Sequence, residues 1–402
     1  MSSSVFSAVE LAPRDPILGL TEAYNSDMRG HKANLGVGVY YDENGKLPLL
    51  KAVQQAEAAR ALSAPTRGYL PIEGVVAYNK AVQELLFGAD SEVIKAGRAA
   101  TFEALGGTGG LRIGADFIKR LKPSATVWIS DPSWENHRAL FEAAGFVVKS
   151  YPYYQASNHG IAFDQTLACL NALPEGDVIV LHACCHNPTG VDMSPAQWQQ
   201  ITDTIKARNL LAFLDMAYQG FGDGIYEDAA ALRTLTASGM SFFISSSFSK
   251  SFSLYGERVG ALTIVTQNQD ETTKVISQVK RVIRTNYSNP PTHGATIVAT
   301  VLSTPELRNM WEDELAGMRN RIRKMRASFV AKLEELGVQQ NMDFVIAQRG
   351  MFSYSGLTST QVDRLRDEFA VYAIGTGRIC VAALNDKNLD PVCEAVAKVM
   401  KS

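Results

Sequence analysis

Uninterrupted apolar runs of strand length stand out in the middle of the chain. Four of them lie at 125–130, 177–182, 210–215 and 241–245, and each is followed by a turn-rich segment. Because these runs do not alternate with polar residues, they predict strands covered on both faces, as in a largely parallel sheet. One more strand is expected at 260–265. The turns after such strands are where an open α/β sheet collects its ligand-binding groups.

A single apolar stripe marks the part of the chain that follows. From Leu307 to Leu336, apolar residues recur at three- and four-residue steps, which predicts one long helix. Thr304 and Pro305 favour its start, and Gly337 favours its end. Beyond it we expect a helix at about 359–370 among short strands at 344–346, 351–354 and 378–381.

Length and patterning predict two domains. A chain of 402 residues is too long for one simple core, and a helix as long as the predicted one often bridges two domains. The first dozen residues are small and polar, and Pro13 and Pro16 then break any helix, which indicates an arm. We expect an arm at 1–12, a large domain at 46–311, and a small domain formed by 13–45 and 312–402.

Composition and charge are those of an ordinary soluble enzyme, with 46% apolar and 20% charged residues. A net charge of −2 argues against nucleic-acid binding, and no apolar stretch is long enough to span a bilayer. The N-terminus lacks the pattern of a secretory signal. The adjacent Cys184 and Cys185 lie in an apolar run, which is typical of reduced core thiols. We therefore expect a cytoplasmic protein that binds neither nucleic acid nor membrane.

Lys250 follows the apolar run at 241–245, and Arg258 stands eight residues later. A lysine at the end of a buried strand is poorly solvated, so it loses its proton more easily and can form a Schiff base. Ser247 and Arg258 are suited to hold a phosphate. The three side chains together suggest pyridoxal 5'-phosphate, an aldehyde that carries a phosphate.

Asp215 ends the apolar run at 210–215, and Tyr218 follows three residues later. A partly desolvated carboxylate needs a positive or N–H partner, and the pyridine nitrogen of the suggested cofactor is such a partner. An ionised aspartate keeps that nitrogen protonated, while Tyr218 is placed to bond the 3'-oxygen. For Asp215 taken alone, capping of the next turn is the commoner role.

Two other turns are candidates, and the second of them follows the predicted strand at 177–182. Gly107 and Thr108 lie in a glycine-rich turn that opens a helix at about 109–121, where free N–H groups form an anion site. This turn matches neither common nucleotide-binding motif and is weak evidence alone. Asn187, after His182 and His186, lies in a tight turn and offers a side-chain amide donor. The two histidines and two cysteines there lack zinc-ligand spacing, so we expect no metal.

Three larger side chains are further candidates. Trp134 follows a strand end and could stack on a flat ring, although core packing is the commoner use of tryptophan. Arg378 heads an apolar strand, so we expect a half-buried guanidinium that needs an anion, best a bidentate carboxylate. Arg284 is a second candidate for a carboxylate; a solvated position on a helix face is its alternative.

In this order, these segments resemble the aspartate and aromatic aminotransferases of the fold-type I pyridoxal-phosphate enzymes. The matching segments lie at 15–18, 34–41, 69–74, 186–190, 247–250 and 287–291. The resemblance covers nearly the whole chain. It implies an α/β fold-type I pyridoxal-phosphate-dependent transferase: a large domain with a mostly parallel seven-stranded sheet between helices, and a smaller α+β domain.

The resemblance also implies a role for each candidate residue. Lys250 would hold the cofactor, Asp215 would pair with its ring nitrogen in front of His137 and His182, and Trp134 would stack on the ring. The 3'-oxygen and the phosphate would be bound by Tyr218, Asn187, Gly107, Thr108, Ser247, Arg258 and, from a neighbouring subunit, Tyr69. The substrate would lie among Gly38, Trp134, Asn187, Arg378 and, from the other subunit, Arg284. A homodimer with shared active sites follows.

Residues around the expected substrate site resemble two different groups within the family. Tyr41, Leu47 and Cys380 resemble the aromatic members of the family, whereas Val39 and Asn289, like Thr108, resemble the aspartate-preferring ones. Since Arg284 is retained, a dicarboxylate should still bind. We interpret the chain as an aminotransferase that moves amino groups from tyrosine, phenylalanine, tryptophan and aspartate to 2-oxoglutarate by a ping-pong mechanism. The alternative is an aspartate aminotransferase with little aromatic activity.

Two other classes of protein share single features with this chain. Ser247 and Lys250 match the Ser-x-x-Lys motif of penicillin-recognising acyl enzymes, but the Ser-Asp-Asn and Lys-Thr-Gly motifs of that class do not occur. A ligand-binding regulator on the same fold would need a basic helix-turn-helix segment, for which the chain has no room. Both alternatives are therefore disfavoured.

Overall fold

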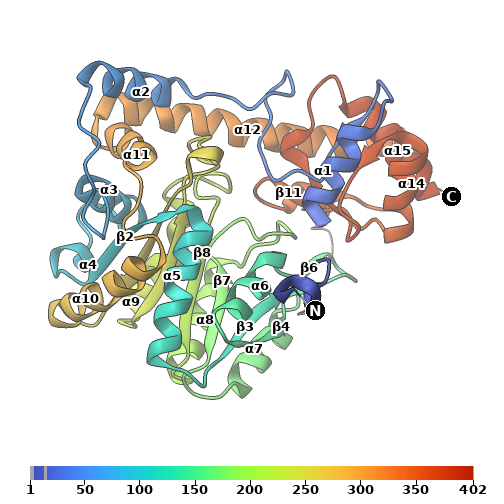
Figure 1. The fold of residues 1–402 in the computed structure, drawn as a ribbon. Coiled ribbons are helices and arrows are strands. Elements are labelled where there is room, and N and C mark those ends of the chain that lie inside the picture. The colour runs from blue at the N-terminus through green and yellow to red at the C-terminus, as the bar shows by residue number, and fades with distance from the viewer. Residues whose placement is uncertain (1–3, 13–15, 402) are drawn as a thin grey trace.

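A seven-stranded sheet organises the larger part of the molecule (Figure 1). The computed structural model describes residues 4–12 and 16–401. The strands follow the order β2-β10-β9-β8-β7-β3-β4, and all neighbours are parallel except at β10, which is antiparallel to both of its neighbours. Their bounds are β2 Ala99–Leu105, β3 Thr126–Asp131, β4 Val147–Pro152, β7 Val178–His182, β8 Leu211–Met216, β9 Phe242–Ser247 and β10 Val259–Val265. The mostly parallel sheet predicted from the sequence is confirmed.

Both faces of this sheet are covered by helices, which explains why the apolar runs do not alternate. Phe213 packs in one hydrophobic cluster with residues of three helices, and its neighbour Leu214 packs in the cluster on the opposite face. The helices of the first face are α5 Gly106–Leu121, α6 Glu135–Ala143 and α10 Gln269–Asn286. Those that contribute to the second cluster include α3 Val76–Phe87, α7 Phe163–Ala172, α8 Pro195–Ala207 and α9 Ala230–Ala237.

The helix after β2 begins three residues earlier than expected. Gly106 has a φ of +70° and its N–H donates to the carbonyl of Arg258 at 3.0 Å, so the chain turns from strand to helix at once. A glycine adopts this conformation without strain. Because α5 begins at Gly106, Gly107 and Thr108 lie in its first turn, where backbone N–H groups have no partner within the helix.

The long helix predicted from the apolar stripe is confirmed as α12, Pro305–Glu335. Trp311, Leu315 and Phe329 of the stripe are buried, and Gly337 with a φ of +75° ends the helix. Thr304 occupies the N-cap position, but its side chain makes no capping bond. In Figure 1, α12 runs from α2 and α11 to the C-terminal lobe. It lies with α2 Lys51–Ser63 and α11 His293–Ser303 at one end and α15 Leu389–Lys401 at the other.

The C-terminal lobe contains segments from the N-terminal and the C-terminal parts of the chain. Strand β1 pairs in parallel with β12, so the segment near residue 33 lies beside the segment near residue 371. A second pair, β11 with β13, is antiparallel and places Tyr354 opposite Arg378. The elements are α1 Pro16–Ser26, β1 Ala33–Asn34, α13 Asp343–Ala347, β11 Phe352–Tyr354, α14 Ser359–Phe369, β12 Val371–Tyr372 and β13 Arg378–Cys380. The domain boundaries at 46 and 312 stay a prediction.

Two local predictions in these regions were wrong. The strand expected at 344–346 is the helix α13, in which Val345 is buried while Ile346 is exposed. Three apolar residues are too few to distinguish the two periods. Pro16 opens α1 rather than breaking a helix, since proline is well suited to the first helical position. Pro13 and Asp15 lie outside the described residues.

The remaining elements are short. They are η1 Val5–Ala8, α4 Glu92–Lys95, β5 Tyr154–Gln155, β6 Gly160–Ile161, η2 Glu227–Ala229, η3 Tyr255–Glu257 and η4 Val381–Ala383. In the N-terminal segment the side chains of Val5, Phe6, Val9 and Leu11 are largely exposed. Among the described residues no helix is long and apolar enough to cross a membrane.

Candidate active site

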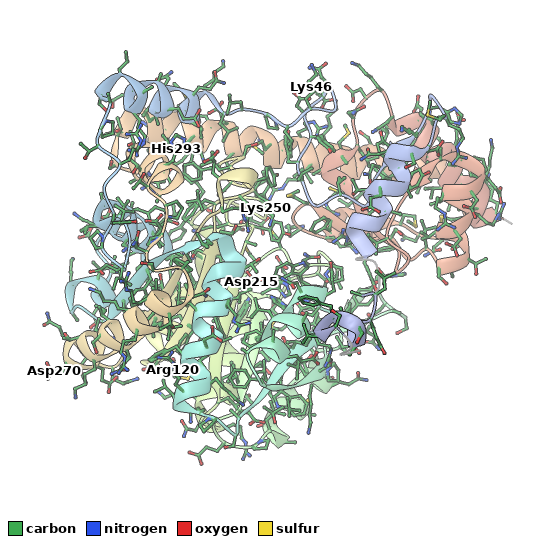
Figure 2. The ribbon with its side chains drawn as sticks, viewed as in Figure 1. Lys46, Arg120, Asp215, Lys250, Asp270 and His293 are labelled. Atoms are coloured by element: carbon green, nitrogen blue, oxygen red, sulfur yellow. The ribbon has the colours of Figure 1, made fainter. Side chains whose placement is uncertain are left out.

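A cavity of about 240 Å³ opens at the carboxyl ends of the parallel strands. The register of the sheet places His182 of β7 opposite Asp215 of β8, and Asp215 opposite Ser245 of β9. Lys250 and Asp215 both line the cavity, and Figure 2 shows Asp215 at the sheet and Lys250 on the side towards α12. Of the residues predicted to bind cofactor or substrate directly, all except Tyr69 and Arg284 line the cavity: Gly38, Gly107, Thr108, Trp134, Asn187, Asp215, Tyr218, Ser247, Lys250, Arg258 and Arg378.

Lys250 lies three residues beyond the end of β9, with its amine 4.9 Å from the centre of the Tyr218 ring. Burial lowers the pKa of Lys250 to about 8, while the nearby carboxylate of Asp215 opposes this shift and Arg258 adds to it. At neutral pH this amine therefore loses its proton far more readily than an exposed lysine. It has the character of a nucleophile and of a base.

Asp215 stays ionised although it is buried. Burial alone would raise its pKa, but a hydrogen bond of 2.8 Å from His137 Nε2 to Oδ2, together with the charge of Lys250, lowers the pKa below the usual value. Ser133 Oγ lies 2.9 Å from His137 Nδ1. The ionised carboxylate accepts the proton on Nε2, and the two bonds together fix the orientation of the ring. The carboxylate thus offers a fixed negative charge to the cavity.

A row of three histidines lies behind Asp215. The ring centres of His137 and His182 are 5.0 Å apart, and those of His182 and His186 are 4.3 Å apart. Burial lowers the pKa of His182 to about 3 and that of His186 well below its usual value, so both rings are neutral. His186 is held by hydroxyl groups on both nitrogens, from Ser130 and Thr189.

Two groups of side chains in the described residues bring potential metal-ligand atoms within 4.8 Å of one another. One consists of His137, His182 and Asp215; the other of Cys184, Cys185 and Asp228. In the first group the Asp215 carboxylate already accepts from His137. In the second, the hydrogen bond between the two thiols lowers the pKa of Cys184, but burial, together with nearby carboxylates, outweighs it and raises that pKa to about 12. The same bond and burial both raise the pKa of Cys185, so both thiols stay protonated. That no metal binds here stays a prediction. Both cysteines are free and buried, as expected from the sequence.

The end of the cavity at α5 has the character of an anion site. The helix begins at Gly106, and a Cβ on this residue would lie 2.5 Å from Nη2 of Arg258. A Cβ on Gly107 would lie 3.0 Å from Cβ of Ser247. The glycines therefore let the helix N-terminus approach both side chains. Arg258 donates to the carbonyl of Tyr255 at 3.1 Å and to the hydroxyl of Ser249 at 3.4 Å, and among the described residues it forms no ion pair with a carboxylate. A helix N-terminus beside such a guanidinium suits a phosphate.

Arg378 also lines the cavity and is buried, not half-buried as expected, with 3% of its surface exposed. Its Nη2 donates to the carbonyl of Gly36 at 2.8 Å, and its guanidinium lies 4.3 Å from the centre of the Phe352 ring. Nε has no hydrogen-bond partner, and neither has Oδ1 of the nearby Asn187. A buried cation without a carboxylate of its own is costly, so Arg378 calls for an anion from outside the chain.

Tyr69 and Arg284 lie outside this cavity. The side chain of Tyr69 is 95% exposed, and Arg284 is exposed near the end of α10, where it bonds Ser288. A single chain therefore does not bring them to the site. Conversely, Ser249, Phe352 and Leu111 line the cavity but were not predicted. Ser249 stands next to Lys250 in the serine-rich run, whereas the sequence does not indicate which face of its strand Phe352 occupies.

The chain was compared with known proteins. The family model of the class I and II aminotransferases matches residues 30–396. The chain belongs to this family. It is 63% identical over 397 residues to the aspartate aminotransferase of Pseudomonas aeruginosa, covering 99% of this chain and 100% of the relative. It is 48% identical over 399 residues to the aromatic-amino-acid aminotransferase of Escherichia coli, covering 98% and 100%.

A solved structure agrees with these relatives. The aromatic-amino-acid aminotransferase from Burkholderia pseudomallei, covalently bound to pyridoxal phosphate, superposes with a TM-score of 0.98 at 62% identity, covering 99% of this chain and 100% of that one. The fold-type I architecture and the aminotransferase activity predicted from the sequence are thus confirmed. The buried amine, the fixed carboxylate and the anion site fit the pyridoxal phosphate of this family. The role of each residue stays a prediction.

Proposed function

We propose that this aminotransferase accepts both aromatic amino acids and aspartate as amino donors, with 2-oxoglutarate as acceptor, in a ping-pong reaction on pyridoxal phosphate. The observation that carries the proposal is the buried Arg378, which has an unpartnered Nε in the same cavity as the Lys250 amine. Of the two relatives compared above, one is an aspartate aminotransferase and the other an aromatic-amino-acid aminotransferase. An aromatic-amino-acid aminotransferase of Psychrobacter, 44% identical, was crystallised with aspartic acid.

Trp134 would stack on the ring of the cofactor. Lys250 would hold it, Asp215 would face its ring nitrogen, and Tyr218 and Asn187 would bond its 3'-oxygen. Its phosphate would be bound by Gly107, Thr108, Ser247, Arg258 and Tyr69 of a second subunit. When bound, pyridoxal phosphate supplies an electron sink for the electron pair left on the substrate Cα.

The residues of the chain then have three tasks. Arg378, beside Gly38, binds the substrate α-carboxylate and so fixes the orientation of the Cα–H bond. The Lys250 amine takes the proton from Cα, and its lowered pKa lets it both accept and release that proton near neutral pH. Asp215, held by His137, remains negative throughout and stabilises the protonated ring nitrogen.

A second copy of the chain completes the site in this proposal. Tyr69 and Arg284 lie outside the cavity of their own chain and are exposed. In a homodimer Tyr69 would reach the phosphate, and Arg284 would meet the distal carboxylate of aspartate or 2-oxoglutarate. Arg284 would turn away when an aromatic side chain enters. We also place the enzyme in the cytoplasm, in keeping with its five free cysteines.

A panel of amino donors with 2-oxoglutarate as acceptor tests this function. We expect aspartate, phenylalanine and tyrosine each to support turnover, with parallel lines in double-reciprocal plots at varied acceptor concentrations. Turnover with aspartate alone would instead identify the alternative, an aspartate aminotransferase with little aromatic activity. Intersecting lines would contradict the ping-pong order.

A further inference from the structure

One segment joins the substrate side of the cavity to the loop that carries Lys250. Residues 35–40, called here the strap, run from β1 past Gly38, which lines the cavity. The Lys250 loop, residues 248–258, also contains Arg258 and Tyr255. Strap and loop are more than two hundred positions apart in the sequence, so their contact depends on the tertiary structure alone.

The first half of the strap is bound to β13, the strand of Arg378. The carbonyl of Leu35 accepts the backbone N–H of Cys380 at 2.7 Å. The carbonyl of Gly36 accepts Nη2 of Arg378 at 2.8 Å. The strap and the guanidinium therefore move as one unit, and a shift of the strap displaces the group that binds the substrate α-carboxylate.

The second half of the strap is held at the peptide group between Val39 and Tyr40, and beyond it the N–H of Tyr41 donates to the carbonyl of Ala382 at 3.2 Å. The carbonyl of the Val39–Tyr40 peptide group, on Val39, accepts the Cys380 thiol at 3.4 Å. Its N–H, on Tyr40, donates to the phenolic oxygen of Tyr255 at 2.9 Å. A peptide group bonded at both ends cannot rotate without breaking a bond. It is thus clamped between β13 and the Lys250 loop.

Both the backbone carbonyl and the phenol of Tyr255 are suited to holding the strap against the Lys250 loop. Its own backbone carbonyl accepts Nη1 of Arg258 at 3.1 Å, so the residue also contacts the phosphate side of the cavity. Burial raises the pKa of the Tyr255 phenol, which therefore stays neutral over the working range of the enzyme. A phenylalanine in its place would leave the Tyr40 N–H without a partner in a partly buried setting.

We propose that Tyr255 is a positioning residue: by accepting the Tyr40 N–H it holds the strap, and with it Gly38 and Arg378, in the place that receives the substrate α-carboxylate. The inference rests on the proposed role of Arg378. Tyr255 contacts neither substrate nor reacting atoms in this account. Its loss should weaken carboxylate binding for every substrate alike and leave the chemistry at Lys250 largely intact.

The test uses the holoenzyme and succinate, a dicarboxylate that binds without reacting because it has no amino or oxo group. Tyr255→Phe should weaken succinate binding about tenfold, the usual consequence of leaving one amide unpaired. The KM values for aspartate and phenylalanine should rise together, with kcat changed less than about threefold. Tyr226→Phe is the matched control, since it removes the hydroxyl of an exposed tyrosine outside the cavity.

Two further variants keep the outcome interpretable. Cys380→Ala removes the other bond to the same peptide group and should weaken succinate binding by about threefold. In the double variant, the loss of binding free energy should be smaller than the sum of the losses in Tyr255→Phe and Cys380→Ala. Arg378→Lys reports on the proposed function itself, because it should abolish tight succinate binding whatever Tyr255 does.

Succinate affinity of Tyr255→Phe within twofold of the Tyr226→Phe control would overturn the positioning role, as would a fall in kcat at unchanged affinity. Additive losses for Tyr255→Phe and Cys380→Ala would overturn the clamp at the Val39–Tyr40 peptide. Unchanged affinity in Arg378→Lys would instead show that the assignment of the carboxylate site fails, which is a distinct result.

Discussion

His137 and Asp215 are joined by a hydrogen bond of 2.8 Å between Nε2 and Oδ2, with Asp215 lining the cavity and His137 behind it. Both side chains are buried, and Asp215 would carry a raised pKa if burial acted alone. The hydrogen bond from His137 therefore keeps the Asp215 carboxylate ionised at a buried position that water does not solvate. Of the three histidines in the row, His137 is the one that bonds Asp215, the carboxylate proposed to face the ring nitrogen of the cofactor.

Removal of this bond should make catalysis sensitive to acid. In His137→Ala, desolvation of Asp215 is no longer opposed by the bond, so its pKa rises. We expect kcat/KM to fall by about 10- to 100-fold near pH 7, as for the loss of one charge-assisted hydrogen bond. The deficit should grow as the pH falls through the raised pKa, because protonated Asp215 has lost its charge.

The pH profile of kcat/KM provides the measurement. His159→Ala is a control, because His159 lies outside the cavity. A His137→Ala enzyme whose deficit is the same at every pH would show that the bond does not set the ionisation of Asp215.

Arg284 should separate the two substrate classes. In Arg284→Ala we expect kcat/KM for aspartate to fall by about 100- to 1000-fold, since a buried carboxylate is left without its charge partner. The value for phenylalanine, which has no distal carboxylate, should change by less than about fivefold.

Arg281→Ala, one turn earlier on the exposed face of α10, is the matched control for Arg284. Steady-state kinetics with both donors give the result. Equal losses for aspartate and phenylalanine would contradict the proposed role of Arg284 in dual specificity.

Much of this site was predictable because several of its residues follow strands that the hydrophobic pattern reveals. Asp215 and His182 end two such runs, and parallel pairing necessarily brings them to one edge of the sheet. The bond between Tyr40 and Tyr255 leaves no trace in the sequence, because an amide and a distant hydroxyl form no periodic pattern. The proposed roles of Tyr69 and Arg284 would require a second chain, which one sequence specifies only through its resemblance to a family.

Glu103 should make the stability of the protein depend on pH near neutrality. This side chain of β2 is 2% exposed, and burial raises its pKa to about 7; a hydrogen bond from the Val75 N–H only partly opposes the shift. The folded-state pKa is thus raised above the ordinary 4.5. The stability associated with the protonated form is fully present below pH 4.5 and is lost as the pH rises through 7.

Glu103→Gln keeps the shape and cannot ionise, so it should gain stability relative to the wild type as the pH rises. Between pH 5 and 9 the difference in free energy of unfolding should change by about 3 kcal/mol in favour of the variant, from a shift of roughly two to three pH units. Denaturant titrations at several pH values measure it. Glu334→Gln, at an exposed position of α12, is the control, and a parallel pH dependence of Glu103→Gln and wild type would contradict the account.

A single turnover without any acceptor tests the central claim most directly. Holoenzyme mixed with excess aspartate, or in a separate experiment with phenylalanine, should release one equivalent of the corresponding 2-oxo acid per active site and then stop. Lys250→Ala should slow this release by at least about 10⁴-fold, because the base that takes the Cα proton is gone. Lys206→Ala, on α8, should release the oxo acid as the wild type does. Release from only one of the two donors, or unimpaired release by Lys250→Ala, would contradict the account.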